Sequence, residues 1–337
     1  MLFSIIVPIF NVDSYLVECL NSIRNQTYTD FECIMVNDGS TDGSSKICED
    51  FAQFDHRFIY IKKKNGGLVS ARKAGADKAR GDFIINVDGD DFIEVDLLER
   101  MQIILSMYNV DLISFGFTKY TNKFESKQAS FLEEGVYDVN KIKYVRSSYM
   151  YSSDISGINS GRLFFNICTK CIKRDIYIIT QQEVSNLIVS GEDTLFTMYL
   201  LDNINSMYSL DYYGYIYRMS PLSIEHTFNE NVFVNLNNVL KEMKKSSFNL
   251  SNSNNILVYY FYRLFRYIII SAKNSKDYNE FSRNMKKVIT PISISDICRI
   301  KIFKHNFSSI LKLFLLKHRC WFVIYLLSKT YFKNVDM

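Results

Sequence analysis

Short apolar segments rich in β-branched residues alternate with helical patterns in the N-terminal part of this 337-residue chain. The predicted strands cover residues 2–9, 31–36, 58–61 and 82–87. One helical pattern begins at Asp13, and two more cover residues 44–54 and 67–79. A fourth helix is predicted by an apolar stripe between Leu97 and Leu105. Strands separated by single helices form parallel sheets with right-handed crossovers. The sequence therefore predicts an α/β fold with a doubly wound, mainly parallel sheet.

Polar residues follow three of these predicted strands. Asn11 comes after the first strand, Asp38 after the second, and a DGDD cluster at residues 88–91 after the fourth. In doubly wound sheets, ligands bind beyond the carboxyl ends of the strands. We therefore expect these side chains to lie on one rim of the sheet and to form a ligand site.

The DGDD cluster places Asp88, Asp90 and Asp91 at the end of one strand. Crowded carboxylates repel one another unless a cation or hydrogen-bond donors offset the charge. Hard divalent ions such as Mg²⁺ or Mn²⁺ take a few carboxylate oxygens and complete their coordination with substrate phosphates and water. The cluster therefore predicts a Mg²⁺ or Mn²⁺ site, and a solvated acidic turn is the alternative.

Residues 38–49 also match an EF-hand calcium loop, with the expected residue types at positions 1, 3, 5, 6 and 12 counted from Asp38. An EF-hand needs a helix that enters the loop, whereas residues 31–36 predict a strand. We therefore favour a nucleotide pocket, in which the Asp38 carboxylate accepts a hydrogen bond from a base N–H group.

A glycine pair, Gly66 and Gly67, begins the third helix, and Arg72 lies within it. Free N–H groups at a helix N-terminus bind phosphate, and a guanidinium adds a planar set of donors. We expect these residues to contact a diphosphate, whereas residues 62–64 (Lys-Lys-Lys) are better interpreted as a solvated basic run. The chain has no GxGxxG after a strand and no GxxxxGK[ST], which argues against a dinucleotide site and a P-loop.

Glu192 and Asp193 begin a further predicted helix directly after Gly191. An acidic residue in the first turn of a helix often interacts only with the helix dipole. These two acids are therefore ambiguous when they are considered alone.

Together, these segments resemble the family 2 glycosyltransferases, which have the GT-A fold and include many enzymes that make bacterial capsule, lipopolysaccharide and other surface glycans. The resemblance covers roughly residues 3–228. Seven elements occur in order: VPIFN at 7–11, NQTYTDFE at 25–32, VNDGSTDGS at 36–44, NGGLVSARKAG at 65–75, GDFIINVDGDD at 81–91, GEDTLF at 191–196 and YRMSPLSI at 217–224. An ordered set of this kind is far more specific than any single motif.

The resemblance implies an inverting, metal-dependent enzyme of the hexosyltransferase type, which transfers a sugar from a UDP-sugar to an acceptor hydroxyl. Asp38 is then expected to bind the uracil, Asp88 the ribose side of the donor, and Asp90 the metal directly, with Asp88 beside it. The expected donor-binding residues are Pro8, Asn11, Asp38, Gly66, Gly67, Arg72, Asp88 and Arg218.

On the acceptor side, the resemblance makes Asp193 the base that takes the acceptor proton, and Glu192 a residue that shapes the acceptor pocket. Arg218, with the loop to Ile224, is expected to close over the diphosphate, while His226 is more often incidental at such a position. Gly89 departs from the larger polar residue of many relatives, which puts the shape of the donor pocket in doubt.

The predicted catalytic domain covers residues 1–228, with a nucleotide-binding half at 1–115 and an acceptor half at 116–228. Residues 111–136, which span the boundary between the two halves, predict an irregular region with strand-like pieces, and residues 147–161 predict a mobile loop near the rim. Two strands, around 206–210 and 212–218, are expected to complete this domain. Residues 229–337 predict a helical extension.

The C-terminal extension is basic. Between Lys286 and Lys333 there are ten Lys or Arg residues and one acid, Asp296. An apolar helix face is formed by Phe303, Phe307, Ile310, Leu311 and Phe314. This pattern predicts a helix that lies on an anionic membrane surface, and hence a lipid-linked oligosaccharide or other glycan acceptor. A helical subdomain that packs on the catalytic sheet is an equally weighted alternative.

The N-terminus does not resemble a secretory signal, and the seven cysteines have no regular spacing. We therefore expect a cytoplasmic protein that is peripheral on the inner face of the plasma membrane. A catalytically silent GT-A scaffold or sugar-nucleotide-binding protein of a glycan assembly complex is the main alternative. A nucleic-acid partner is not expected, because the apolar faces suit a bilayer better than a phosphate groove.

Overall fold

A computed structural model describes residues 2–121, 124–130, 132–150, 163–219, 231–246, 248–289, 295–296, 298–300 and 307–330. The chain divides into two compact units: unit 1 comprises residues 1–146 and 163–220, and unit 2 comprises residues 147–162 and 221–337. The predicted boundary after residue 228, and residues 151–161 of the predicted loop, lie outside the described residues.

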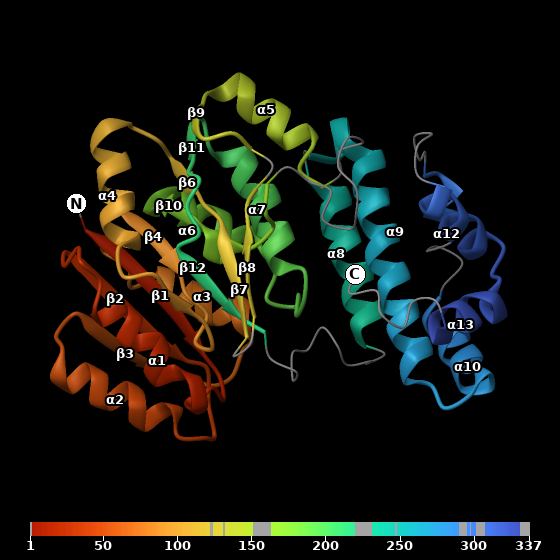
Figure 1. Ribbon diagram of the computed structural model, residues 1–337, viewed down its shortest axis with the longest axis horizontal. Helices are drawn as coiled ribbons and strands as arrows, with labels where there is room; N and C mark the ends of the chain where they lie inside the picture. Colours follow the sequence, from red (N-terminus) through yellow and green to blue (C-terminus); the bar gives the residue numbers. More distant parts are fainter. Residues whose placement is uncertain are drawn as a thin grey trace. The chain divides into compact units, whose positions relative to one another are not determined.

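Unit 1 is built on a sheet of eight strands in the order β3-β2-β1-β4-β10-β6-β11-β9 (Figure 1). The first four strands in chain order are all parallel: β1 (Phe3–Ile9), β2 (Phe31–Asn37), β3 (Phe58–Lys62) and β4 (Phe83–Asn86). The helices between them are α1 (Asp13–Arg24), α2 (Ser44–Phe54) and α3 (Leu68–Ala76). The predicted α/β fold with a mainly parallel sheet is therefore confirmed.

Helical periodicity explains how these elements pack. The buried residues of α1 are Leu16, Cys19, Leu20 and Ile23, which recur at three- and four-residue spacing and therefore lie on one face. Helix α4 (Leu97–Met107) buries the whole apolar stripe that its sequence predicts. Every residue of β1 and β2 is buried, as expected for inner strands of a sheet that is covered on both faces.

The second half of the large sheet contains strands of both directions. β10 (Lys170–Lys173) runs antiparallel between β4 and β6 (Leu112–Ser114). β11 (Met207–Ser209) is parallel to β6, and β9 (Gly135–Tyr137) forms the antiparallel edge. This half also carries α5 (Val139–Ser147), α6 (Arg174–Glu183) and α7 (Glu192–Asn203).

A separate four-stranded sheet, which the sequence pattern does not predict, has the order β5-β12-β7-β8. Its strands are β5 (Phe92–Ile93), β12 (Tyr215–Arg218), β7 (Phe117–Thr121) and β8 (Phe124–Gln128). β5 follows the DGDD cluster directly and pairs with β12. This pairing brings Arg218 to the DGDD cluster.

Unit 2 is helical in its described part, as predicted for the extension. Its helices are α8 (Asn231–Lys245), α9 (Phe248–Asn274), α10 (Tyr278–Val288), α12 (Phe307–Lys317) and α13 (Trp321–Thr330). Buried Phe261, Phe265 and Ile268 of the long helix α9 contribute to its core. Within the described segments, no helix is both long enough and apolar enough to cross a membrane.

Candidate active site

Asp38 is the first residue after β2, and its buried carboxylate organises the loop before α3. It accepts hydrogen bonds from the N–H groups of Gly66, at 3.0 Å, and Gly67, at 2.7 Å. The ammonium of Lys63 also donates to it. The expectation that the two glycine N–H groups are free is therefore wrong, because both donate to Asp38. The solvated interpretation is also wrong for Lys63, since it pairs with this buried acid.

Asn11 turns the chain at the end of β1 with a φ of 53°, a backbone conformation that asparagine tolerates better than most residues. Its side-chain oxygen accepts a hydrogen bond from the N–H of Thr41, so it lies at the loop that follows Asp38. Pro8 is buried within β1, and a Cβ at Gly89 would lie 3.3 Å from its carbonyl oxygen. The residue type at position 89 therefore affects the packing of the DGDD turn on β1.

The EF-hand interpretation fails because a strand, β2, enters this loop. Asp42 instead joins the starts of two helices: its carboxylate accepts hydrogen bonds from the N–H groups of Asp13 and Ser44. In return, the Asp13 carboxylate accepts one from the N–H of Gly43. These are capping interactions of α1 and α2, which explains the acidic residues without calcium.

The three acids of the DGDD turn have different surroundings. Asp91 accepts hydrogen bonds from the Tyr215 hydroxyl, at 2.6 Å, and the Arg218 N–H, at 2.8 Å, so it links the turn to β12. Burial raises the pKa of Asp88 to about 6, although the charge of Arg72 opposes this rise. Burial also raises the pKa of Asp90. Two carboxylates with raised pKa values at one strand end are expected of a site that receives positive charge.

Arg72 joins the end of β4 to the start of α7. Its guanidinium lies 2.6 Å from the Asp193 carboxylate, 3.2 Å from that of Asp88 and 3.7 Å from that of Glu192. The arginine side chain is only 2% exposed. The predicted diphosphate contact is not what this geometry favours, because both terminal nitrogens already face carboxylates in a buried position.

Asp193 has a second hydrogen bond, which its other carboxylate oxygen accepts from the Ile167 N–H at 3.3 Å. The loop that carries this N–H is held by Lys170, a fully buried lysine of β10. Its ammonium donates to the carbonyl oxygens of Phe164 and Asn166, at 2.8 and 2.5 Å. Burial lowers the pKa of Lys170 to about 8. Lys170 therefore positions the backbone that orients Asp193.

Glu192 shares this environment with Asp193. Burial, followed by the negative charge of Asp193, raises the pKa of Glu192 to about 8. The raised pKa favours the protonated form of Glu192, which can donate a hydrogen bond, whereas a side chain that only balanced a helix dipole would carry a charge.

Arg218 lies at the end of β12 beside the DGDD turn. Its guanidinium donates to the carbonyl oxygen of Asp90, at 3.0 Å, and to the carboxylate of Glu18, at 2.6 Å. The rings of Tyr15 and Tyr120 lie 5.0 and 5.6 Å from it. The expected continuation, with the loop to Ile224 and His226, lies outside the described residues.

The oxygen donors of the DGDD turn suit a hard divalent cation. In the part of the chain that the structure describes, no group of three or more His, Cys, Asp or Glu residues is arranged to hold a metal by itself. Asp90 and Asp88 fit a cation that takes its remaining ligands from a substrate and water. The raised pKa values of both acids agree with this, because a bound cation would stabilise their charged forms.

Comparison with known families identifies the N-terminal half. Residues 4–168 match the model of glycosyl transferase family 2. This segment belongs to that family. Its relatives include the glycosyltransferase GlyA of Streptococcus pneumoniae serotype 4, which is 44% identical over 109 residues, and the uncharacterized glycosyltransferase EpsJ of Bacillus subtilis, which is 31% identical over 223 residues. These matches cover 32% and 66% of this chain.

The chain spans 16% of the length of GlyA and 62% of that of EpsJ. The fold is also that of a solved structure. The structure of S. aureus TarS 1-349 in complex with UDP-GlcNAc aligns with a TM-score of 0.66 at 19% identity, over 99% of this chain and 92% of that one. A GT-A architecture is therefore shown for this chain.

Sequence reasoning did not find Lys170, Tyr215 or Glu18 in this site. Lys170 is an ordinary lysine in a short strand, and Tyr215 and Glu18 occupy common strand and helix positions. Their partners are far away in the chain, so no local spacing signals them. In contrast, sequence motifs had suggested Asp88, Glu192 and Asp193, whose carboxylates surround Arg72. They had also suggested Asp90 and Arg218, which contact each other.

Proposed function

We propose that this chain is an inverting glycosyltransferase that transfers a sugar from a UDP-sugar to an acceptor hydroxyl in surface-glycan synthesis. The proposal rests on the match of residues 4–168 to glycosyl transferase family 2 and on solved TarS structures of the same fold in complex with UDP and UDP-GlcNAc. A further relative, 42% identical over 102 residues, is the minor teichoic acid biosynthesis protein GgaB of Bacillus subtilis.

One observation supports the proposed site above all others. Arg72 contacts Asp88, just after the end of β4. It also contacts Asp193, which lies 121 residues after Arg72 in the chain. Such a buried contact joins a donor-side acid to an acceptor-side acid within one cluster. A group that binds the donor and a base that serves the acceptor must be close neighbours for a direct transfer.

In the proposed reaction, the acceptor oxygen attacks the anomeric carbon while the bond to the UDP oxygen breaks on the opposite face, which inverts the configuration. Asp193 takes the proton of the attacking hydroxyl, and Arg72 and the Ile167 N–H hold its carboxylate in position. General-base help of this kind contributes about 10²- to 10⁴-fold. Glu192, whose raised pKa favours its protonated form, donates a hydrogen bond to the acceptor.

On the donor side, Asp38 is proposed to bind the uracil, with Pro8, Asn11, Gly66 and Gly67 forming the surrounding pocket. Asp88 is proposed to bind the ribose side of the donor, and Arg218 the diphosphate. Mg²⁺ or Mn²⁺, held by Asp90 with Asp88, would supply electrostatic stabilisation of the charge on the departing diphosphate.

The proposed acceptor is a glycan or a lipid-linked oligosaccharide at the inner face of the plasma membrane, with the protein peripheral and cytoplasmic. Basic helices of unit 2 support this location, since residues 307–330 carry four Lys or Arg residues and no acid. Basic surfaces of this kind are attracted to anionic lipid.

The test measures release of UDP from a panel of UDP-sugars with Mg²⁺ or Mn²⁺, and titrates UDP binding in the same samples. Asp193→Asn is expected to lose turnover by about 10²- to 10⁴-fold while keeping UDP affinity. Asp90→Ala is expected to lose turnover together with metal-dependent UDP affinity. Asp50→Ala, on the exposed surface of α2, is the matched control and should behave like the unmodified protein.

Absence of UDP binding with either metal would overturn the proposal at its base. UDP binding without turnover on any acceptor, with identical behaviour of Asp193→Asn, would favour the catalytically silent alternative. NMR of the first product anomer tests inversion separately.

A further inference from the structure

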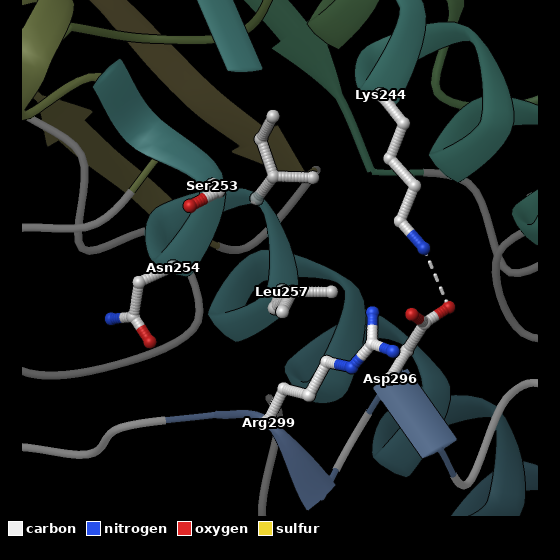
Figure 2. Close-up of a pocket in the computed structure, with 7 residues that line it drawn as sticks. Lys244, Ser253, Asn254, Leu257, Asp296 and Arg299 are labelled. Atoms are coloured by element: carbon white, nitrogen blue, oxygen red, sulfur yellow. Dashed lines mark hydrogen bonds and ion pairs between the residues drawn. The ribbon is translucent and has the colours of Figure 1, made fainter. Parts of the chain in front are cut away.

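A cavity of about 460 Å³ lies within unit 2, and none of the residues that line it belongs to the proposed catalytic site (Figure 2). It is lined by residues of α8, α9 and the short segment 295–300, among them Lys244, Ser253, Asn254, Leu257, Asp296 and Arg299. A cavity of this volume is within the usual range for small ligands. The catalytic proposal gives it no role.

The charges of this cavity favour an anionic ligand. Lys244 is paired with the buried carboxylate of Asp296 at 2.7 Å. Arg299 points into the cavity, and no described carboxylate lies within ion-pair distance of its guanidinium (Figure 2). The cavity therefore has one positive charge in excess, with the hydroxyl of Ser253 and the amide of Asn254 as further hydrogen-bonding groups.

The described lining residues include no aromatic ring, although such rings are the usual stacking surface for flat or weakly polar ligands. The arginine, lysine, hydroxyl and amide groups of the lining can instead donate hydrogen bonds to the oxygens of a phosphate. The apolar atoms of Leu257 on the wall suit the glycerol part of a headgroup better than a free ion.

An exposed apolar surface adjoins this region. On α12, Ile310, Leu311 and Phe314 are exposed, and on α13, Phe322, Val323 and Leu326 are exposed at the same i, i+1, i+4 spacing. Phe314 is 53% exposed and Phe322 is 54% exposed. Exposed apolar groups of this kind on neighbouring helices mark interaction surfaces.

Two observations connect the apolar surface with the cavity and with anionic lipid. The ammonium of Lys317, in the last turn of α12, donates to the carbonyl oxygen of Cys298 at 3.5 Å, beside Arg299. Residues 307–330 contain four Lys or Arg residues and no acid. The helices that carry the surface have 11 and 10 residues, too short to span a bilayer of about 30 Å.

We infer that unit 2 docks on an anionic phospholipid bilayer, with a phosphate headgroup in the Lys244–Arg299 cavity and the apolar faces of α12 and α13 in the acyl boundary. The inference extends the membrane partner of the proposed function. It assigns a headgroup site that is separate from the donor site. Arg299 contributes the charge, and Phe314 and Phe322 contribute the apolar contact.

The test is flotation of the full chain with phosphatidylcholine vesicles that contain or lack phosphatidylglycerol. Binding is expected only to the anionic vesicles and is expected to weaken as salt is raised. Arg299→Gln should weaken binding about fivefold, the effect of removing one basic residue from an anionic surface. Phe314→Ser should weaken it about tenfold through lost apolar burial.

Matched controls come from unit 1. Lys78→Gln removes an exposed cation, and Phe54→Ser removes an apolar side chain that is 80% exposed. Both should bind vesicles like the unmodified chain. UDP titration of every variant keeps the two proposals separate, because Arg299→Gln and Phe314→Ser should retain UDP affinity even where they lose vesicle binding.

Three outcomes would overturn the inference. Equal binding to neutral and anionic vesicles would exclude a site that selects anionic headgroups. Unchanged binding of Arg299→Gln would remove the cavity from the docking surface. A stable dimer in light scattering that Phe314→Ser dissociates, without vesicle binding by either form, would show that a second copy covers the apolar surface. Glycerol phosphate added to the flotation assay distinguishes the sources of phosphate: competition at low concentration would show that the cavity prefers a free phosphate ester.

Discussion

Replacement of Arg72 by methionine is expected to leave a cluster of acids without its cation. The guanidinium is 2% exposed, and its neighbours Asp88, Asp193 and Glu192 retain 31%, 25% and 14% side-chain exposure. Removal of one partner from a buried ion pair costs about 3–5 kcal/mol, because the remaining charge stays buried. The partial exposure of the acids lowers this cost, so we expect Arg72→Met to reduce the free energy of unfolding by about 3 kcal/mol.

The pH dependence of this loss gives a second signature. Burial raises the pKa values of Asp88 and Glu192, and the charge of Arg72 opposes this rise. Without Arg72, both pKa values should rise further, so the folded state binds more protons than the unfolded state. Stability is then present at low pH and is lost as the pH rises through the folded-state pKa values. The difference between Arg72→Met and the unmodified protein should therefore shrink between pH 7 and pH 5.

Urea unfolding at several pH values measures both effects, and UDP-sugar turnover is followed in parallel. Arg100→Met is the control, because Arg100 forms an exposed ion pair with Asp96 and should contribute at most about 1 kcal/mol. Arg72→Lys should recover part of the stability but little turnover, since one ammonium cannot replace a planar donor set between two acids. A loss in Arg72→Met no larger than that in Arg100→Met, and independent of pH, would refute the reasoning.

Three further changes test other parts of unit 1. Burial raises the pKa of Glu192 to about 8. Its contribution to the free energy of unfolding is therefore fully present below its unfolded-state pKa and is lost as the pH rises through about 8. In Glu192→Gln, this loss of stability with rising pH, measured by urea unfolding, should be smaller. Lys170→Met should cost about 1–3 kcal/mol in the same assay, because the carbonyl oxygen of Phe164 loses its donor, and should lower turnover more than UDP affinity. Gly75→Ala should cost about 1–3 kcal/mol in thermal or urea unfolding, since its Cβ would lie 2.5 Å from Cγ2 of Ile6 between α3 and β1; an unchanged midpoint would show that the interface adjusts freely.

Local patterns were sufficient for the first half of unit 1. The strand and helix segments predicted from β1 to α4 match the structure to within a few residues, and the predicted apolar stripe of α4 is entirely buried. Each of these elements has a clear period and clear end signals within its own residues. The position of polar residues after strands also suggested Asp38, Asp88 and Asp90 as site residues.

Residues 111–136 show where local patterns fail. They contribute β6, β7, β8 and β9 to two different sheets, and their strands are only three to five residues long. Strands this short carry too few alternations to show a period. Their partners β12 and β11 lie far away in the chain, so pairing is decided by the assembled core.

The roles of individual polar groups also needed the assembled structure. The N–H groups of Gly66 and Gly67 looked free in the sequence, but they donate to Asp38, 28 and 29 residues away. Arg72 looked like a ligand for phosphate, but it is buried between Asp88 and Asp193. A buried donor takes whichever acceptor the fold brings to it, because an unsatisfied one is costly.

The sequence by itself therefore determined the alternating architecture, the family and the acids at the strand ends, since all of these are local or ordered patterns. Only the tertiary structure decided which partner each charge has: Lys63 with Asp38, Arg72 with Asp193, Arg218 with Glu18, and Lys170 with the loop that orients Asp193. These contacts join segments that are separate in the chain, and hydrogen-bond and charge energies depend on distance in space and not on spacing in sequence.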